Sequence, residues 1–250
     1  MKHVKNDGVY VQRRWLLLIL CTVLTHQSYA DMVQLDTTQS GDSLNRLVHA
    51  LATSDKTVQK EEPVPAQKVF PEDYQRLSIQ PLYKDSEVSY HSNDRSYKEI
   101  KYFSNNIMML HNLNDKYVFV VDLENEDPVQ NGWAIACEKD HITDEKNCVI
   151  SKFDLMIVKN SKYGIGLTVS KELSKLNYYK YHYIRIDKNQ PFKTKDMFWG
   201  QSALNIIQQM QRGSVAYTRF YDWSDSYEET LSLYGLSAAY QIMNIMYARL

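Results

Sequence analysis

The amino-acid sequence predicts a mainly β fold: an antiparallel β-sandwich or open barrel with two short helices, one at the C-terminus, and a flexible N-terminal extension. Three observations support this prediction. From residue 98 onward, short runs of β-branched and aromatic residues follow one another closely, as antiparallel strands do. Two cysteines lie within that part of the chain. The residues before it are polar and contain several prolines.

The first thirty residues have the three parts of a secretory signal peptide. Four basic side chains precede an apolar run over residues 15–24, and Ser28-Tyr29-Ala30 has small residues where a signal peptidase needs them. The apolar run is about half of the ~20 residues that cross a membrane. We therefore expect cleavage after Ala30 and no transmembrane anchor afterwards. The predicted location is the periplasm, or the outside of the cell.

Residues 31–97 form a polar extension in which Gln, Ser, Thr, Lys and Glu dominate. Such a segment buries too little apolar surface to offset its ordering entropy, so we predict that it is largely disordered. Four apolar residues between Leu44 and Leu51 recur at helical spacing and predict a short helix over residues 43–53. We favour a helix that docks on the domain or stays loose. The alternative is a tethered helix that binds a partner.

Residues 98–250 form the predicted disulfide-stapled, β-rich domain. Apolar residues in several of its segments alternate with polar ones, which buries one face of each strand. The expected strands cover residues 117–123, 133–137, 149–157, 163–169, 178–187, 215–223 and 230–234. Strands this close in sequence favour antiparallel pairing between neighbours.

Two segments of this domain have helical rather than strand periodicity. Residues 202–212 place four apolar side chains on one side and stop at Gly213, a common residue at the end of a helix. Residues 236–250 repeat apolar side chains at spacings of four and three, as an amphipathic helix does. Both segments are therefore expected to be short helices.

Cys137 and Cys148 are the two cysteines that remain once the predicted signal peptide is removed. An even pair in an exported chain favours a disulfide bond. A redox or nucleophilic pair usually has a tighter Cys-x-x-Cys spacing and electropositive surroundings, whereas the residues between these two are acidic and polar. We predict a structural bridge.

Signatures of catalysis are not found in the sequence. It has no phosphate-binding loop, no Gly-x-Ser-x-Gly and no His-Glu-x-x-His, and its histidines have no metal-ligand spacing. The formal net charge of −1 provides no overall basic field for nucleic acid. We therefore predict no catalytic residue, no metal, no cofactor and no nucleic-acid partner.

The 19 tyrosines are the unusual feature of the composition. Tyr179, Tyr181 and Tyr183 share one face of an expected strand, and Tyr217, Tyr221 and Trp223 share a face of a later one. Tyrosines packed across neighbouring strands would give this pattern, and we favour that reading. The alternative is recognition, because a ring with a polar tip adds contact area at a small entropic cost. These six residues are the candidates for a binding surface.

A set of short motifs resembles the invasion-associated locus B family of bacterial periplasmic proteins. The motifs are Gly132-Trp133-x-x-x-Cys137, Cys148, Ile184-Arg185-Ile186-Asp187, Gln211-Arg212-Gly213, Tyr217 with Phe220, and Ser232-Leu233-x-Gly235-Leu236-x-Ala238-Ala239. The resemblance covers roughly the second half of the chain. This chain lacks the second cysteine pair that members of the family often carry. It implies a β-sandwich-like envelope protein linked to host invasion, virulence or stress, and it supplies no catalytic residues.

The leading hypothesis for function is a non-enzymatic exported β-domain that binds an envelope or host protein. Two alternatives remain open. One is a periplasmic hydrolase with an unrecognised active site, and the other is an accessory component of a secretion apparatus. The partner and the oligomeric state cannot be predicted from the sequence.

Overall fold

The computed structural model describes residues 66–170 and 173–250 of the chain. The predicted signal peptide and the predicted helix over residues 43–53 lie outside the described residues. Within them, no helix is long and apolar enough to span a membrane.

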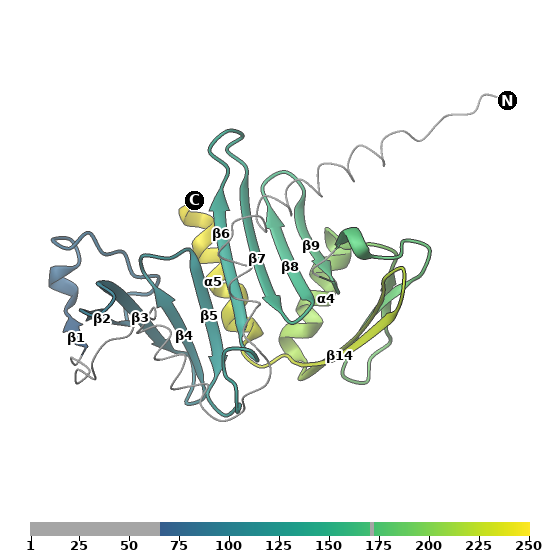
Figure 1. The fold of residues 1–250 in the computed structure, drawn as a ribbon, viewed down its shortest axis with the longest axis horizontal. Coiled ribbons are helices and arrows are strands. Elements are labelled where there is room, and N and C mark those ends of the chain that lie inside the picture. The colour runs from purple at the N-terminus through teal and green to yellow at the C-terminus, as the bar shows by residue number, and fades with distance from the viewer. Residues whose placement is uncertain (1–65, 171–172) are drawn as a thin grey trace.

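Two antiparallel sheets dominate the described residues and confirm the predicted mainly β class. The larger sheet is a meander in which each strand from β1 to β9 pairs with the next along the chain, and β12 then pairs with β9 (Figure 1). Its strands are β1 (Gln67–Val69), β2 (Glu87–His91), β3 (Ser96–Tyr102), β4 (Ile107–Asn112), β5 (Tyr117–Asp122), β6 (Trp133–Lys139), β7 (Lys146–Lys152), β8 (Leu155–Asn160), β9 (Gly164–Thr168) and β12 (Phe198–Trp199).

The large sheet begins well before residue 98, where the sequence placed the start of the domain. Strands β1 and β2 lie inside the predicted extension, so residues 66–97 are not disordered. Three apolar residues from separate short segments, Val69, Ile79 and Val88, form a small core there. They lie in a stretch of mostly polar composition and are distant from one another in the sequence, so composition alone does not reveal the cluster.

A buried carboxylate holds the loop after β1 on the sheet. Glu99 in β3 is 0% exposed and accepts hydrogen bonds from the backbone N–H groups of Leu82 (2.9 Å) and Tyr83 (3.0 Å). It also accepts one from the Ser86 hydroxyl (2.7 Å) and pairs with His111 Nδ1 (3.1 Å). Burial alone would raise the pKa of Glu99, but these hydrogen bonds outweigh burial and lower it.

The expected strand over residues 149–157 is two strands, β7 and β8, joined by a tight turn at Phe153 and Asp154. Phe153 has a φ of 49°, in the left-handed region that glycine or asparagine usually occupies in such turns. Because neither residue is present, the sequence carries no sign of the turn. Apolar alternation continues on both sides of it, which made the segment resemble one strand.

The second sheet has four strands in the order β11, β10, β13 and β14. Its strands are β10 (His182–Ile186), β11 (Phe192–Thr194), β13 (Val215–Tyr221) and β14 (Ser226–Ser232). The expected strand over residues 178–187 is therefore shorter, and Tyr179 and Tyr181 precede it. The expected last strand, residues 230–234, begins earlier and ends at Ser232.

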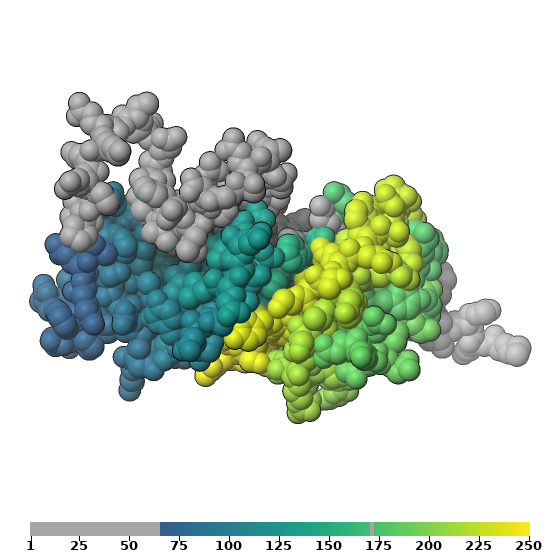
Figure 2. Space-filling model, turned by 90° about the horizontal axis from the view of Figure 1, so that it is seen from below, coloured from purple at the N-terminus to yellow at the C-terminus, as the bar shows by residue number. Residues whose placement is uncertain are grey.

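Two α-helices complete the described part of the fold, α4 (Gln201–Arg212) and α5 (Leu236–Arg249), both close to their predicted bounds. Helix α5 packs across β5, β6 and β7, and α4 packs on β9 and β12 (Figure 1). Figure 2 shows the C-terminal segment in yellow beside the teal strands of the large sheet and the green segments. Two single-turn helices, η1 (Pro71–Asp73) and η2 (Leu173–Lys175), lie in connections.

One hydrophobic core joins the two sheets and the two helices. It contains Ile135 of β6, Ile184 of β10, Ile206 of α4 and Met243 of α5, all of them buried. Gly213 follows the last residue of α4, and a Cβ there would lie 2.5 Å from Cγ2 of Ile186. Close packing of the helix end on β10 therefore requires glycine at this position.

Cys137 and Cys148 form the predicted disulfide bond. They lie directly opposite each other on β6 and β7 and are buried beneath α5. The bridge closes a hairpin loop of sequence separation 11. Its burial in the core fits a structural bridge.

Two polar side chains of the large sheet fix the chain between β14 and α5. Trp133 Nε1 donates to the carbonyl of Tyr234 (2.9 Å), and Lys152 Nζ donates to the carbonyl of Ser232 (2.9 Å). Lys152 also lies over the Trp133 ring, 5.3 Å from its centroid. Burial lowers the pKa of Lys152 to about 8, against a smaller opposite effect of Asp122. These contacts hold the edge of the small sheet against the large one.

Candidate binding face

The small sheet turns one face to the core and the other to solvent. In β10, His182, Ile184 and Ile186 are buried, whereas Tyr183 and Arg185 between them point to the opposite side. Successive side chains of a strand alternate between the two faces. Four of the predicted binding residues therefore lie on or beside a surface that is held rigidly by a buried inner face: Tyr181, Tyr183, Tyr217 and Tyr221.

Strand β13 repeats this arrangement. Ala216, Thr218 and Phe220 are buried, and Tyr217 and Tyr221 lie on the outer face. Arg219 lies between these two tyrosines on the same face. Tyr217 is 39% exposed. The alternation therefore places a cation between two rings along a single strand.

The pairing register brings the tyrosines of β10 and β13 together. Tyr183 lies opposite Arg219, and Arg185 lies opposite Tyr217, so rings and cations alternate across the strands as well as along them. Lys193 of β11 lies opposite Tyr183 on its other side. We call the outward side chains Tyr181, Tyr183, Tyr217 and Tyr221, with Tyr179 and Trp223 at one end, the tyrosine face.

Tyr179 and Trp223 lie just outside the strands, where β10 begins and β13 ends. Their rings meet edge to face with centroids 5.9 Å apart. They are 80% and 61% exposed, well above the other members of the face. A bridge between Leu176 and Asp222 joins the two chain segments beneath them. All six predicted residues thus gather at one surface, in the strands or directly beside them.

Four cations lie over the rings of this face. Arg185 lies 4.7 Å from the Tyr217 centroid and Lys180 lies 4.8 Å from that of Tyr221. Lys193 and Lys195 both lie over Tyr181, at 4.8 and 5.3 Å. We call Lys180, Arg185, Lys193 and Lys195 the cation set. Sequence reasoning missed it, although two of its members lie among the tyrosines of residues 179–185 and were visible there.

The charges of the face are unevenly neutralised. Arg219 forms an ion pair with Glu228 across β13 and β14, and this hydrogen bond raises the pKa of Arg219. Among the described residues, no member of the cation set has an ion pair within 4.0 Å. The face is therefore locally basic, although the whole chain has a net charge of −1.

His182 lies directly beneath the face. Its Nδ1 accepts a hydrogen bond from the backbone N–H of Tyr221 (3.1 Å), which places the ring proton of the neutral form on Nε2. Nε2 has no hydrogen-bond partner in the described part of the chain. The pKa of His182 is lowered chiefly by burial, against smaller raising effects of backbone groups of Lys195 and Asn177 and of the Asp196 charge. The folded sheet therefore favours the neutral form of His182.

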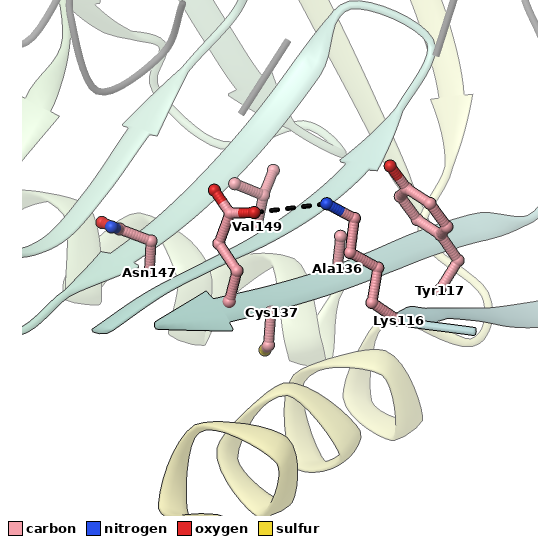
Figure 3. A pocket seen from close by; sticks show the side chains of 7 residues that line it. Lys116, Tyr117, Ala136, Cys137, Asn147 and Val149 are labelled. Atoms are coloured by element: carbon pink, nitrogen blue, oxygen red, sulfur yellow. Dashed lines mark hydrogen bonds and ion pairs between the residues drawn. The ribbon is translucent and has the colours of Figure 1, made fainter. Parts of the chain in front are cut away.

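Figure 3 shows a pocket on the large sheet, away from the tyrosine face. Lys116 and Glu138 form an ion pair across it (3.2 Å), and Cys137 lies in its wall. Its free volume is about 10 Å³, which holds roughly one water molecule. The pocket has no room for a substrate.

A larger cleft of about 840 Å³ lies between the start of α5, the end of α4 and the turns of the large sheet. Its described lining includes no histidine and no cysteine. Asp122 in this lining accepts hydrogen bonds from the Glu124 N–H (3.1 Å) and from Asn125 Nδ2 (2.8 Å). Glu124 Oε1 accepts a hydrogen bond from Asn106 Nδ2. Both carboxylates thus accept hydrogen bonds, Asp122 within its own turn and Glu124 from the turn between β3 and β4.

Residues 66–170 and 173–250 contain no group of three or more His, Cys, Asp or Glu side chains placed to hold a metal ion. Comparison of the chain with protein-family models, with characterised proteins and with solved structures finds no match.

Proposed function

We propose that this chain is an exported, non-enzymatic binding protein that contacts an envelope or host protein through its tyrosine face. The observation that carries the proposal is the convergence of six aromatic residues on one solvent-facing surface. They come from two strands and from the segments that adjoin those strands.

The physical properties of the face support binding. The inner side of the sheet is part of the core, so the backbone is already ordered and little entropy is lost on association. Tyrosine and tryptophan have few rotatable bonds and combine apolar contact area with a polar group. A partner that covers this face would therefore meet preorganised rings.

The hydrolase alternative has less support among the described residues. The described lining of the large cleft has no histidine or cysteine, and its two carboxylates accept hydrogen bonds from neighbouring turns. A general base or nucleophile would need a free, converging arrangement. The tyrosine face offers contact area and charge, which suit recognition better than proton transfer.

Export is inferred from the sequence and fits the buried disulfide bond. The resemblance to the invasion-associated locus B family suggests the bacterial envelope as the place of action. Host invasion, virulence and envelope stress are the processes that this resemblance implies.

Crosslinking in cells tests the proposal. A variant with Tyr179→Ser, Tyr181→Ser and Tyr217→Ser should lose the crosslinked partner and keep its unfolding midpoint, because all three rings are exposed. Tyr102→Ser, at an equally exposed position on the large sheet, is the matched control and should retain the partner. Unchanged capture by the triple variant would show that this face is not the contact surface.

A further inference from the structure

We infer that the tyrosine face recognises an acidic protein segment in extended conformation. This inference rests on the proposed function and names the chemistry of the partner. It draws on three features of the face: the unpaired cations, the occupied ring faces and the spacing of the side chains.

The first feature is the charge. Lys180, Arg185, Lys193 and Lys195 are all exposed, and none has an ion pair among the described residues. Each is held over a tyrosine ring, so its head group is positioned at the surface. A ligand with carboxylates would meet fixed cations and would lose little side-chain entropy in pairing with them.

Asp222 and Asp187, two carboxylates that border the face, form no ion pair with the cation set among the described residues. Asp222 accepts hydrogen bonds from the backbone N–H groups of Ser224 (2.7 Å) and Asp225 (2.6 Å). Asp187 accepts hydrogen bonds from Ser214 and Val215. Both are thus tied to backbone groups of the turns at the ends of the strands. The charges of the cation set remain available to a partner.

The second feature separates a protein segment from nucleic acid. Proteins bind single-stranded nucleic acid by stacking bases on free aromatic faces. Here cations lie over the rings of Tyr181, Tyr217 and Tyr221, which occupies a face of each ring. Tyr179 and Trp223 at one end of the face keep exposed rings (80% and 61%), but the other three rings present hydroxyl groups and cationic head groups. Carboxylates and backbone amides match such groups.

The third feature is the spacing. Tyr217, Arg219 and Tyr221 are alternate residues of β13, so their side chains repeat every ~6.6–6.8 Å. Alternate side chains of an extended partner segment have the same repeat. Arg185 of β10 lies beside Tyr217, and Lys193 of β11 lies beyond it next to Tyr183, so further cations lie along one side of a segment that runs along β13. An extended chain with acidic residues at alternate positions fits this pattern.

Binding of defined probes to the purified protein tests the inference. The probes are fluorescein-labelled peptides of alternating Glu and Ser, the matched peptide of alternating Gln and Ser, an oligothymidylate of equal length, and heparin. The Glu peptide should bind more tightly than the Gln peptide and weaken as salt is added, because exposed charges are screened. Equal affinity for the two peptides, or tighter binding of oligothymidylate or heparin, would overturn the inference.

Charge variants locate the site. Arg185→Gln with Lys193→Gln should lower the affinity for the Glu peptide about two- to five-fold for each cation removed. Lys68→Gln, at an exposed lysine of β1, is the matched control and should change nothing. If the charge variant keeps full affinity for the Glu peptide while its unfolding midpoint is unchanged, the cation set is not the site.

The two proposals fail in different ways. If the tyrosine triple variant loses its crosslinked partner and the charge variant keeps it, the binding function stands and the acidic partner is wrong. If both variants keep the partner, the tyrosine face itself is wrong.

Discussion

Replacing Glu99 by Gln is the sharpest test of how the described fold is held together. The carboxylate accepts three hydrogen bonds, from Leu82, Tyr83 and Ser86, and pairs with His111, all at a site that is 0% exposed. Glutamine has nearly the same shape but only one acceptor oxygen. Its amide nitrogen would face at least one of these donors and could not accept a hydrogen bond from it.

The size of the effect follows from the bonds that are lost. A buried donor left without an acceptor costs about 1–3 kcal/mol, and a hydrogen bond to a charged group is worth about 1.5–3 kcal/mol. We therefore expect Glu99→Gln to lower the free energy of unfolding by about 3–5 kcal/mol, from one donor left without an acceptor and from the weaker hydrogen bonds that a neutral amide accepts.

Urea unfolding followed by tryptophan fluorescence measures this change. Glu87→Gln, at an exposed glutamate of the neighbouring strand β2, is the control and should leave the free energy of unfolding nearly unchanged. The pH dependence gives a second check. Because the pKa of Glu99 is lowered in the fold, its stabilisation is complete above its unfolded pKa of 4.5 and is lost as the pH falls below that value. A loss of less than about 1 kcal/mol for Glu99→Gln would refute the reasoning.

Two further predictions concern the small sheet and the disulfide bond. The pKa of His182 is lowered in the fold, so the unfolded chain binds a proton below pH 6.5 that the folded chain excludes, and stability should fall as the pH drops below 6.5. His182→Asn, which keeps an acceptor for the Tyr221 N–H, should reduce this loss in thermal melts between pH 5 and pH 7, and an unchanged pH slope would contradict the assignment. Replacing Cys137 and Cys148 together by Ala should lower the free energy of unfolding by about 2–3 kcal/mol, because the unfolded chain is no longer constrained. Equal urea midpoints for the oxidised wild type and this variant would argue against that contribution.

The sequence predicted local features well where apolar or aromatic residues repeat every two to four positions. The helices over residues 201–212 and 236–249 follow from apolar spacings of three and four. That Tyr217 and Tyr221 share a face follows from the alternation along a strand. That this face points to solvent was not predicted, because alternation alone does not say which face of a strand is buried. The disulfide bond follows from the number of cysteines.

Turns and small clusters were predicted less well. The turn at Phe153 lacks the residues that usually mark a tight hairpin, so β7 and β8 resembled one strand. Strands β1 and β2 were assigned to the extension because the segment is mostly polar and its three buried apolar residues are distant from one another in the sequence. The loop that Glu99 holds is ordered by one buried carboxylate, and composition does not reveal its partners.

The sequence by itself determined the β class, the two helices and that the tyrosines of each strand share one face, because these depend on residues a few positions apart. Only the tertiary structure decided that β10 and β13 are neighbours and that Arg185 lies over Tyr217. These two residues are 32 positions apart, and only strand register brings them together. Register depends on the packing of the whole sheet against the core, which no local pattern encodes.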